Sequence, residues 1–170
     1  MAFDVYSATV PVFSRMLRNL TSHLDKAEAF AASRKYDPSM FLQHRLAPDM
    51  LPFVQQIQIA CDTAKICCAR VAGVDAPKFE DNEKTMAEIK ARVARTLDFL
   101  GSVAKEKFAG ADARQVTFNF RRQPTTAPGE TYVLGHAIPN FFFHYTTAYA
   151  LMRQAGVEIG KADYLGDFLA

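Results

Sequence analysis

The sequence lacks long apolar runs and carries only a small excess of positive charge. No run approaches the roughly 18 consecutive apolar residues of a membrane-spanning helix. The stretch Met1–Tyr6 has neither the basic nor the apolar region of a secretory signal. The net charge is +2 and the basic residues are scattered, so nothing indicates a nucleic-acid partner. We therefore expect a cytoplasmic protein that binds neither a membrane nor nucleic acid.

The sequence also lacks the common catalytic motifs. It contains no GxGxxG, P-loop, HExxH or GxSxG pattern, so the usual signatures of dinucleotide-binding enzymes, nucleoside triphosphatases, zinc proteases and serine hydrolases are missing. Three cysteines, Cys61, Cys67 and Cys68, lie close together without a CxxC spacing. We interpret them as small buried residues of a reducing compartment, with a reactive thiol as the alternative.

What the sequence does contain is helical periodicity. Its 170 residues, 49% hydrophobic and 22% charged, suit one globular domain spanning residues 1–170. Apolar residues at steps of three and four, beginning at Phe3, predict a first helix of nearly 30 residues, with a kink at Pro11. A connection over 33–49 follows. Asp49 is predicted to cap a second helix that ends at Gly73, where a left-handed residue is expected.

The second half of the chain predicts two more helices with a hairpin between them. Thr85 and Glu88 have the spacing of a capping box, and the apolar stripe after them extends to Phe108. Residues 116–121 alternate in polarity like a strand, and residues 131–134 are predicted to pair with them across a turn at 123–130. The last helix is predicted to end at Arg153, and the segment 161–169 to pack on the helices. The fold class is therefore all-α, a four-helix bundle with a small β-hairpin between helices three and four.

One histidine of the last helix stands out as a candidate site residue. His144 interrupts the apolar stripe of that helix, so its ring is predicted to be buried and to need a hydrogen-bond partner or a ligand. Asn140 lies one helical turn earlier, and Gln58 and Asp62 of the second helix are predicted to turn inward. Asp62 would then orient His144 or join it as a ligand. The alternative is a core histidine within a buried polar network, with Asp62 and Lys65 as a surface pair.

The other three histidines are weaker candidates. His136 lies eight residues before His144, about 12 Å away along an unbroken helix, so the two can share a metal ion only if Pro139 breaks the helix sharply. His23 is predicted on a wet flank of the first helix. His44 lies in the loop beside Arg45 and Asp49, which are predicted to contact each other.

Three segments resemble an uncharacterised bacterial family, domain of unknown function 1993, which is placed with the DinB/YfiT-like four-helix proteins. The segments are Arg45–Met50, Gly135–His144 and Gly160–Gly166. The resemblance implies a metal site of three histidines, one from helix two and a His-x-x-x-His pair on the last helix, in thiol-dependent transferases and isomerases. That pair falls on Asn140 and His144, and helix two has no histidine, only Gln58 and Asp62 near the expected position. An amide and a carboxylate make a harder and weaker site for zinc or nickel.

Two functions follow as hypotheses. The first is a small-molecule-binding protein, a degenerate metal-dependent transferase or hydrolase, with a site between helices two and four. Gln58, Asp62, Asn140 and His144 would bind the ligand, and His144, Asn140 and Asp62 would hold a weakly bound divalent metal, if any. The alternative is a non-enzymatic binding or stress-related protein without metal. A homodimer formed through Phe118 and Phe120 is compatible with both.

Overall fold

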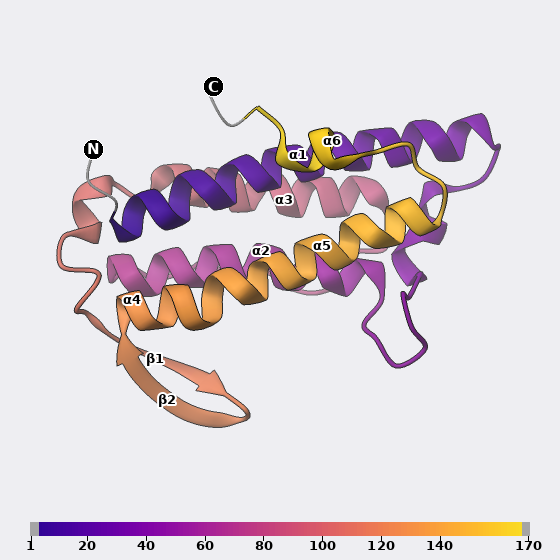
Figure 1. The fold of residues 1–170 in the computed structure, drawn as a ribbon. Helices are drawn as coiled ribbons and strands as arrows, with labels where there is room; N and C mark the ends of the chain where they lie inside the picture. The colour runs from indigo at the N-terminus through magenta and orange to yellow at the C-terminus, as the bar shows by residue number, and fades with distance from the viewer. Residues whose placement is uncertain (1–3, 168–170) are drawn as a thin grey trace.

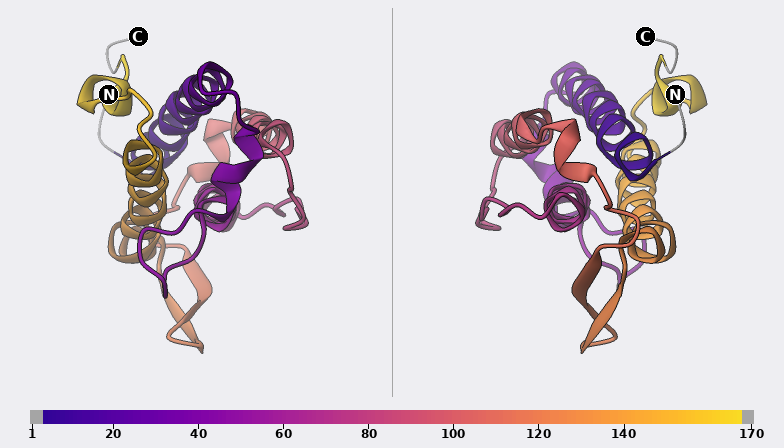
Figure 2. Two further views of the ribbon diagram at one scale, coloured as in Figure 1. Left: turned by 90° about the vertical axis from the view of Figure 1, so that its right-hand side faces the viewer. Right: turned by 90° about the vertical axis from the view of Figure 1, so that its left-hand side faces the viewer.

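Four long helices pack side by side in the computed structural model, which describes residues 4–167 (Figure 1). They are α1 (Val5–Ser33), α2 (Phe53–Ala72), α3 (Met86–Ser102) and α5 (Ile138–Gln154). Helix α2 contacts α1, α3 and α5, and α1 also contacts α3 and α5. The views along the helices show them around a common interior (Figure 2). The predictions at Phe3, Phe168 and Leu169 lie outside the described residues.

The interior is built from the apolar stripes that the sequence predicted. Phe13, Leu17, Ile57 and Phe141 are all at most 1% exposed, and the rings of Phe13 and Phe141 lie 4.6 Å apart. The three cysteines are buried and free, and burial raises the pKa of Cys61 and Cys68 to about 12. Thiols in this state stay protonated and unreactive, in agreement with their interpretation as small core residues.

The predicted helix ends are partly confirmed. Thr85 and Glu88 form the predicted capping box, and Gly73 is left-handed with a φ of 68°. Asp49 does not cap α2, because Pro52 occupies the N-cap position and makes no side-chain cap bond. In the preceding loop, which includes the short helix η1 (Pro38–Gln43), the Arg45 guanidinium donates to the Met50 carbonyl rather than pairing with Asp49.

The third helix is shorter than predicted, and the hairpin uses a different second strand. Helix α3 ends at Ser102, and Phe108 belongs to the short helix η2 (Lys105–Phe108). Strand β1 (Gln115–Phe120) is confirmed, but its partner is β2 (Gln123–Pro128), and residues 131–134 are helical instead. Arg121 and Arg122 have φ values of 50° and 64°, as a two-residue hairpin turn requires. Such a turn usually contains Asn or Gly, so a pair of arginines does not predict it from the sequence.

Short elements connect and flank the four long helices. Helix α4 (Gly129–Tyr132) and the π-helical turn η3 (Val133–Ala137) lead from the hairpin into α5. Gly129 is required there, because a Cβ would lie 2.0 Å from the Ala111 carbonyl oxygen. Helix α6 (Lys161–Leu165) lies on α1, as predicted for this segment (Figure 1). Among the described residues, no helix has the length and apolar character needed to cross a membrane.

Candidate functional site

The imidazole of His144 lies in the contact between α5 and α2, and its orientation is fixed by one amide. Its Nδ1 is 2.7 Å from Oε1 of Gln56, and His144 and Gln56 are 8% and 1% exposed. The Gln56 amide is itself oriented, because its Nε2 donates to the Leu51 carbonyl at 2.9 Å. Since Oε1 can only accept, Nδ1 of His144 must carry the hydrogen.

This arrangement leaves the other ring nitrogen with a free lone pair. Burial lowers the pKa of His144, so the ring is neutral at pH 7. A neutral ring with its hydrogen on Nδ1 is unprotonated at Nε2. Within residues 4–167 no hydrogen bond reaches Nε2, yet it is not enclosed, so it retains some contact with solvent. Nε2 can therefore accept a proton or a hydrogen bond, or bind a metal ion.

Near His144 there is a second polar contact between α5 and α2, and there are also exposed apolar side chains. The Asn140 amide donates from Nδ2 to the Thr63 hydroxyl of α2 at 2.8 Å. Phe143 is 57% exposed, and its ring meets the His144 ring edge-on at 5.1 Å. Leu51 is 41% exposed. We call this group the α2–α5 seam; its residues are Leu51, Gln56, Thr63, Asn140, Phe143 and His144.

Gln58 and Asp62, the other two predicted site residues, lie outside the seam. Gln58 donates from Nε2 to Glu83 at 2.8 Å, and Asp62 pairs with Lys65 at 2.9 Å and with Arg92 at 3.0 Å. The predicted partnership of Asp62 with His144 does not form in this structure. Gln58 and Asp62 are four residues apart on one face of α2 that is directed toward α3. Gln56 and Thr63, seven residues apart, share the face directed toward α5.

The face of α2 toward α3 holds a buried charge network. The Arg92 side chain is fully buried and contacts Glu83 at 2.9 Å, Asp81 at 2.8 Å and Asp62 at 3.0 Å. Burial raises the pKa of Glu83, but hydrogen bonds from Arg92 and Gln58 outweigh it, so the pKa lies below its ordinary value. Lys65, 4% exposed, stands 3.9 Å above the Phe79 ring. The pairing of Asp62 with Lys65 is confirmed. Lys65, Arg92 and Glu83 are buried, whereas the side chains of Asp62 and Asp81, 30% and 59% exposed, reach the surface.

Two residues that organise these sites are not among the predicted site residues. Arg92, an arginine that would ordinarily face solvent, lies between the buried residues Ile89 and Thr96 and is itself 0% exposed. Gln56, rather than Gln58, is the glutamine of α2 that contacts His144. The signal that identifies it is its spacing of seven residues from Thr63, which places both on the line that meets α5.

The donors of the seam do not fit a strong metal site. In the described part of the chain, no group of three or more His, Cys, Asp or Glu side chains could hold a metal ion. Asp62 is held by two cations, and Asn140 offers only an amide oxygen. His136 packs instead on Phe118 and Tyr132, at 5.0 Å and 5.8 Å between ring centres. His144 is thus the one imidazole at the seam, and a single strong donor is not enough for tight zinc or nickel binding.

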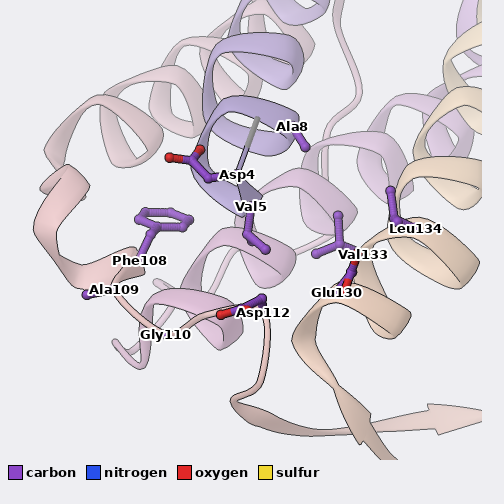
Figure 3. A pocket seen from close by; sticks show the side chains of 10 residues that line it. All are labelled: Asp4, Val5, Ala8, Phe108, Ala109, Gly110, Asp112, Glu130, Val133 and Leu134. Atoms are coloured by element: carbon purple, nitrogen blue, oxygen red, sulfur yellow. The ribbon is translucent and has the colours of Figure 1, made fainter. Parts of the chain in front are cut away.

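A cavity of about 440 Å³ lies away from the seam, between the start of α1, the segment 108–112 and the turn formed by α4 and η3 (Figure 3). Asp4, Asp112 and Glu130 contribute carboxylates to an otherwise largely apolar lining that includes Phe108 and Leu134. The Asp4 carboxylate already accepts from the Ser7 amide at 2.7 Å, where it caps α1. None of the four predicted site residues lines this cavity.

Comparisons with known proteins agree with this architecture. A crystal structure described as a DinB family member protein from Shewanella denitrificans superimposes with a TM-score of 0.91 and 45% sequence identity, covering 98% of this chain and 94% of that chain. A search of curated proteins found no match. The sequence model of one family, Domain of unknown function (DUF1993), matches residues 5–165. This chain therefore belongs to the family of domain of unknown function 1993.

Proposed function

We propose that this protein is a DinB-like four-helix bundle that binds a small molecule at the α2–α5 seam. The observation that carries the proposal is the fixed orientation of His144. Gln56 holds Nδ1 as a donor at 2.7 Å and thereby leaves the Nε2 lone pair for a ligand. A core histidine also needs a partner for Nδ1, so the distinguishing feature is Nε2, which is neither enclosed nor hydrogen-bonded within the described residues.

The chemistry of the seam indicates the kind of ligand. Nε2 of His144 accepts a hydrogen bond, so the ligand should carry a hydroxyl, N–H or thiol donor. Phe143, whose ring lies 5.1 Å from that of His144, is 57% exposed and favours an apolar group next to that donor. If a reaction takes place there, Nε2 would act as the general base that removes the proton of the donor. Any divalent metal would bind weakly, since His144 is its only strong donor.

Phenol and anisole make a matched pair of probes, because both present an aromatic ring and only phenol is a donor. We expect phenol to shift the ring-nitrogen NMR signals of His144 and to bind more tightly than anisole. Binding at the seam should be lost in His144→Ala and retained in Leu134→Trp, which fills the cavity at the other end of the molecule. Equal affinity for both probes, or shifts at Leu134 rather than His144, would refute the proposal. Titration of the same samples with Zn²⁺ tests the metal, and stoichiometric tight binding would contradict the weak site.

The second candidate is a non-enzymatic, dimeric binding protein, and one observation bears on it. Phe118, which the sequence suggested as an interface residue, is only 8% exposed and packs on Tyr132 at 4.8 Å within its own chain. Phe120 remains 46% exposed at the turn of the hairpin. If the hairpin mediates a homodimer, Phe120→Asp should increase the elution volume in size-exclusion chromatography. An unchanged volume would remove the hairpin as the interface.

A further inference from the structure

His23 of α1 is enclosed by aromatic rings from α5. It is 1% exposed, so its predicted position on a wet flank is wrong. The rings of Tyr145 and Tyr149 from α5 lie 6.2 Å and 6.0 Å from its own. Neither ring nitrogen makes a hydrogen bond within the described residues, and the hydroxyl of the fully buried Tyr145 makes none either. Burying polar groups without hydrogen-bond partners costs free energy, so these groups destabilise the arrangement that encloses them.

Helix α6 forms the cover over this region, and it is held mainly by polar contacts. The ring of Tyr164 packs edge-on against Tyr145 at 5.0 Å and against Tyr149 at 5.4 Å. Asp163 pairs with Lys26 of α1 at 2.6 Å, and the Asn19 amide donates to the Tyr164 carbonyl at 3.1 Å. No residue of α6 is itself buried. A five-residue helix held in this way can leave the surface without opening the main core.

The charged groups around His23 come from two elements. Asp163 of α6 favours the protonated ring, Lys26 of α1 disfavours it, and the remaining neighbours named above are tyrosines. Burial lowers the pKa of His23, and it outweighs the attraction that both the backbone and the carboxylate of Asp163 exert on the protonated ring. The Asp163 carboxylate is held ionised by Lys26, and its own pKa lies below the ordinary 3.8. An imidazole exposed to water has an ordinary pKa of 6.5, so His23 is the group of this cluster whose charge can change between pH 7.5 and pH 5 once water reaches it.

We propose that α6 is a pH-sensitive cover, closed over His23 while the ring is neutral and released when the ring is protonated. Protonation adds a second N–H and a positive charge to a ring that is 1% exposed, and the attraction of the Asp163 backbone and carboxylate offsets only part of the cost of burying that charge. Opening α6 gives the imidazolium access to water. Because enclosure lowers the pKa of His23, the closed form is favoured above the ordinary value of 6.5 and is lost as the pH falls below it. At pH 5 an exposed imidazole is almost fully protonated, so the ratio of open to closed molecules can rise by up to about 30-fold.

Hydrogen exchange of single amides, measured by NMR, tests the cover directly. The amides of Tyr164 and Gly166 donate to the carbonyls of Gly160 and Ala162 within the closed segment. Their protection, expressed relative to an unstructured peptide at the same pH, should fall between pH 7.5 and pH 5. It should not change with pH in His23→Gln, and His44→Gln, which removes an exposed histidine elsewhere, should behave like the unaltered protein. Constant protection in the unaltered protein, or an equal fall in His23→Gln, would overturn the proposal.

A second measurement does not depend on how well the variant folds. The ring nitrogens of His23 can be titrated by NMR in the unaltered protein alongside the exchange of the α6 amides. The proposal requires both to change over the same pH range. A ring that becomes protonated while Tyr164 and Gly166 keep their full protection would also overturn it.

Discussion

Replacing Arg92 with methionine should destabilise the protein strongly, because the variant leaves carboxylates without their cation. The guanidinium is fully buried and contacts Glu83, Asp62 and Asp81 within 3.0 Å, and the Glu83 side chain is only 3% exposed. Removing one partner of a buried ion pair typically costs 3–5 kcal/mol, more than the pair itself contributes, because the remaining charge is not solvated. We expect a loss of about 3–5 kcal/mol from the free energy of unfolding, a large part of the roughly 5–15 kcal/mol of an ordinary domain.

The size of this loss should depend on pH in a defined direction. In the unaltered protein, hydrogen bonds hold the pKa of Glu83 below its ordinary 4.5, so its contribution is present above that pH and is lost as the pH falls through the lowered pKa. In Arg92→Met, burial is no longer opposed by the cation, and the pKa of Glu83 should rise. The carboxyl then becomes protonated in mild acid, and the deficit of the variant should narrow between pH 7 and pH 5.

Urea unfolding followed by circular dichroism provides the measurement, and the chain offers a matched control. Arg95 also lies over the Phe79 ring, at 4.6 Å, but its side chain is exposed. Arg95→Met should therefore cost less than about 1 kcal/mol. Combining Arg92→Met with Glu83→Gln should recover part of the loss. Similar small losses for Arg92→Met and Arg95→Met, or a deficit that widens in acid, would show that the network is not the buried ion-pair lock inferred from the structure.

Three further predictions concern the helices and the hairpin. Thr85→Ala removes the cap of α3 and should cost about 1 kcal/mol, seen as a lower melting temperature; no change would mean that the cap is dispensable. Gly101→Ala should stabilise α3 by about 0.5–1 kcal/mol, since a Cβ there meets nothing within 4 Å. Gly129→Ala should destabilise the protein, because its Cβ would meet the Ala111 backbone. Chemical denaturation that ranked the two variants in the opposite order would contradict this packing. Phe118→Ala should cost about 3 kcal/mol and Phe120→Ala less than 1, and equal losses in urea would contradict their different burial.

The main elements of the fold could be predicted because their signals are local. Helical periodicity and the Thr85 capping box depend on residues within a few positions of one another, and both are confirmed. The errors fell where a local rule was broken. The hairpin turns on Arg121 and Arg122 in left-handed conformations that the residue types do not reveal. Its second strand contains Pro124 and Pro128, which discourage a strand assignment although a two-stranded hairpin tolerates them.

The candidate site could be predicted only as far as His144 and Asn140. Their positions on the last helix were read from periodicity, and the burial of His144 is confirmed. Which polar residue of α2 would meet His144 depended on the rotation of α2 about its own axis. That rotation is set by contacts far apart in the sequence, such as Gln58 with Glu83. The same dependence placed Arg92 inside and turned His23 toward α6, away from the solvent where a polar side chain would be expected.

The central claim is that Gln56 holds His144 as a neutral ring with its hydrogen on Nδ1 and a free lone pair on Nε2. A long-range ¹H–¹⁵N NMR spectrum of the His144 ring at pH 7 tests it most directly, with assignment by comparison with His144→Ala. We expect a protonated Nδ1 and an unprotonated Nε2, and a loss of this preference in Gln56→Leu. A doubly protonated ring at pH 7, or a ring with its hydrogen on Nε2, would refute this orientation and remove the basis for a ligand at the α2–α5 seam.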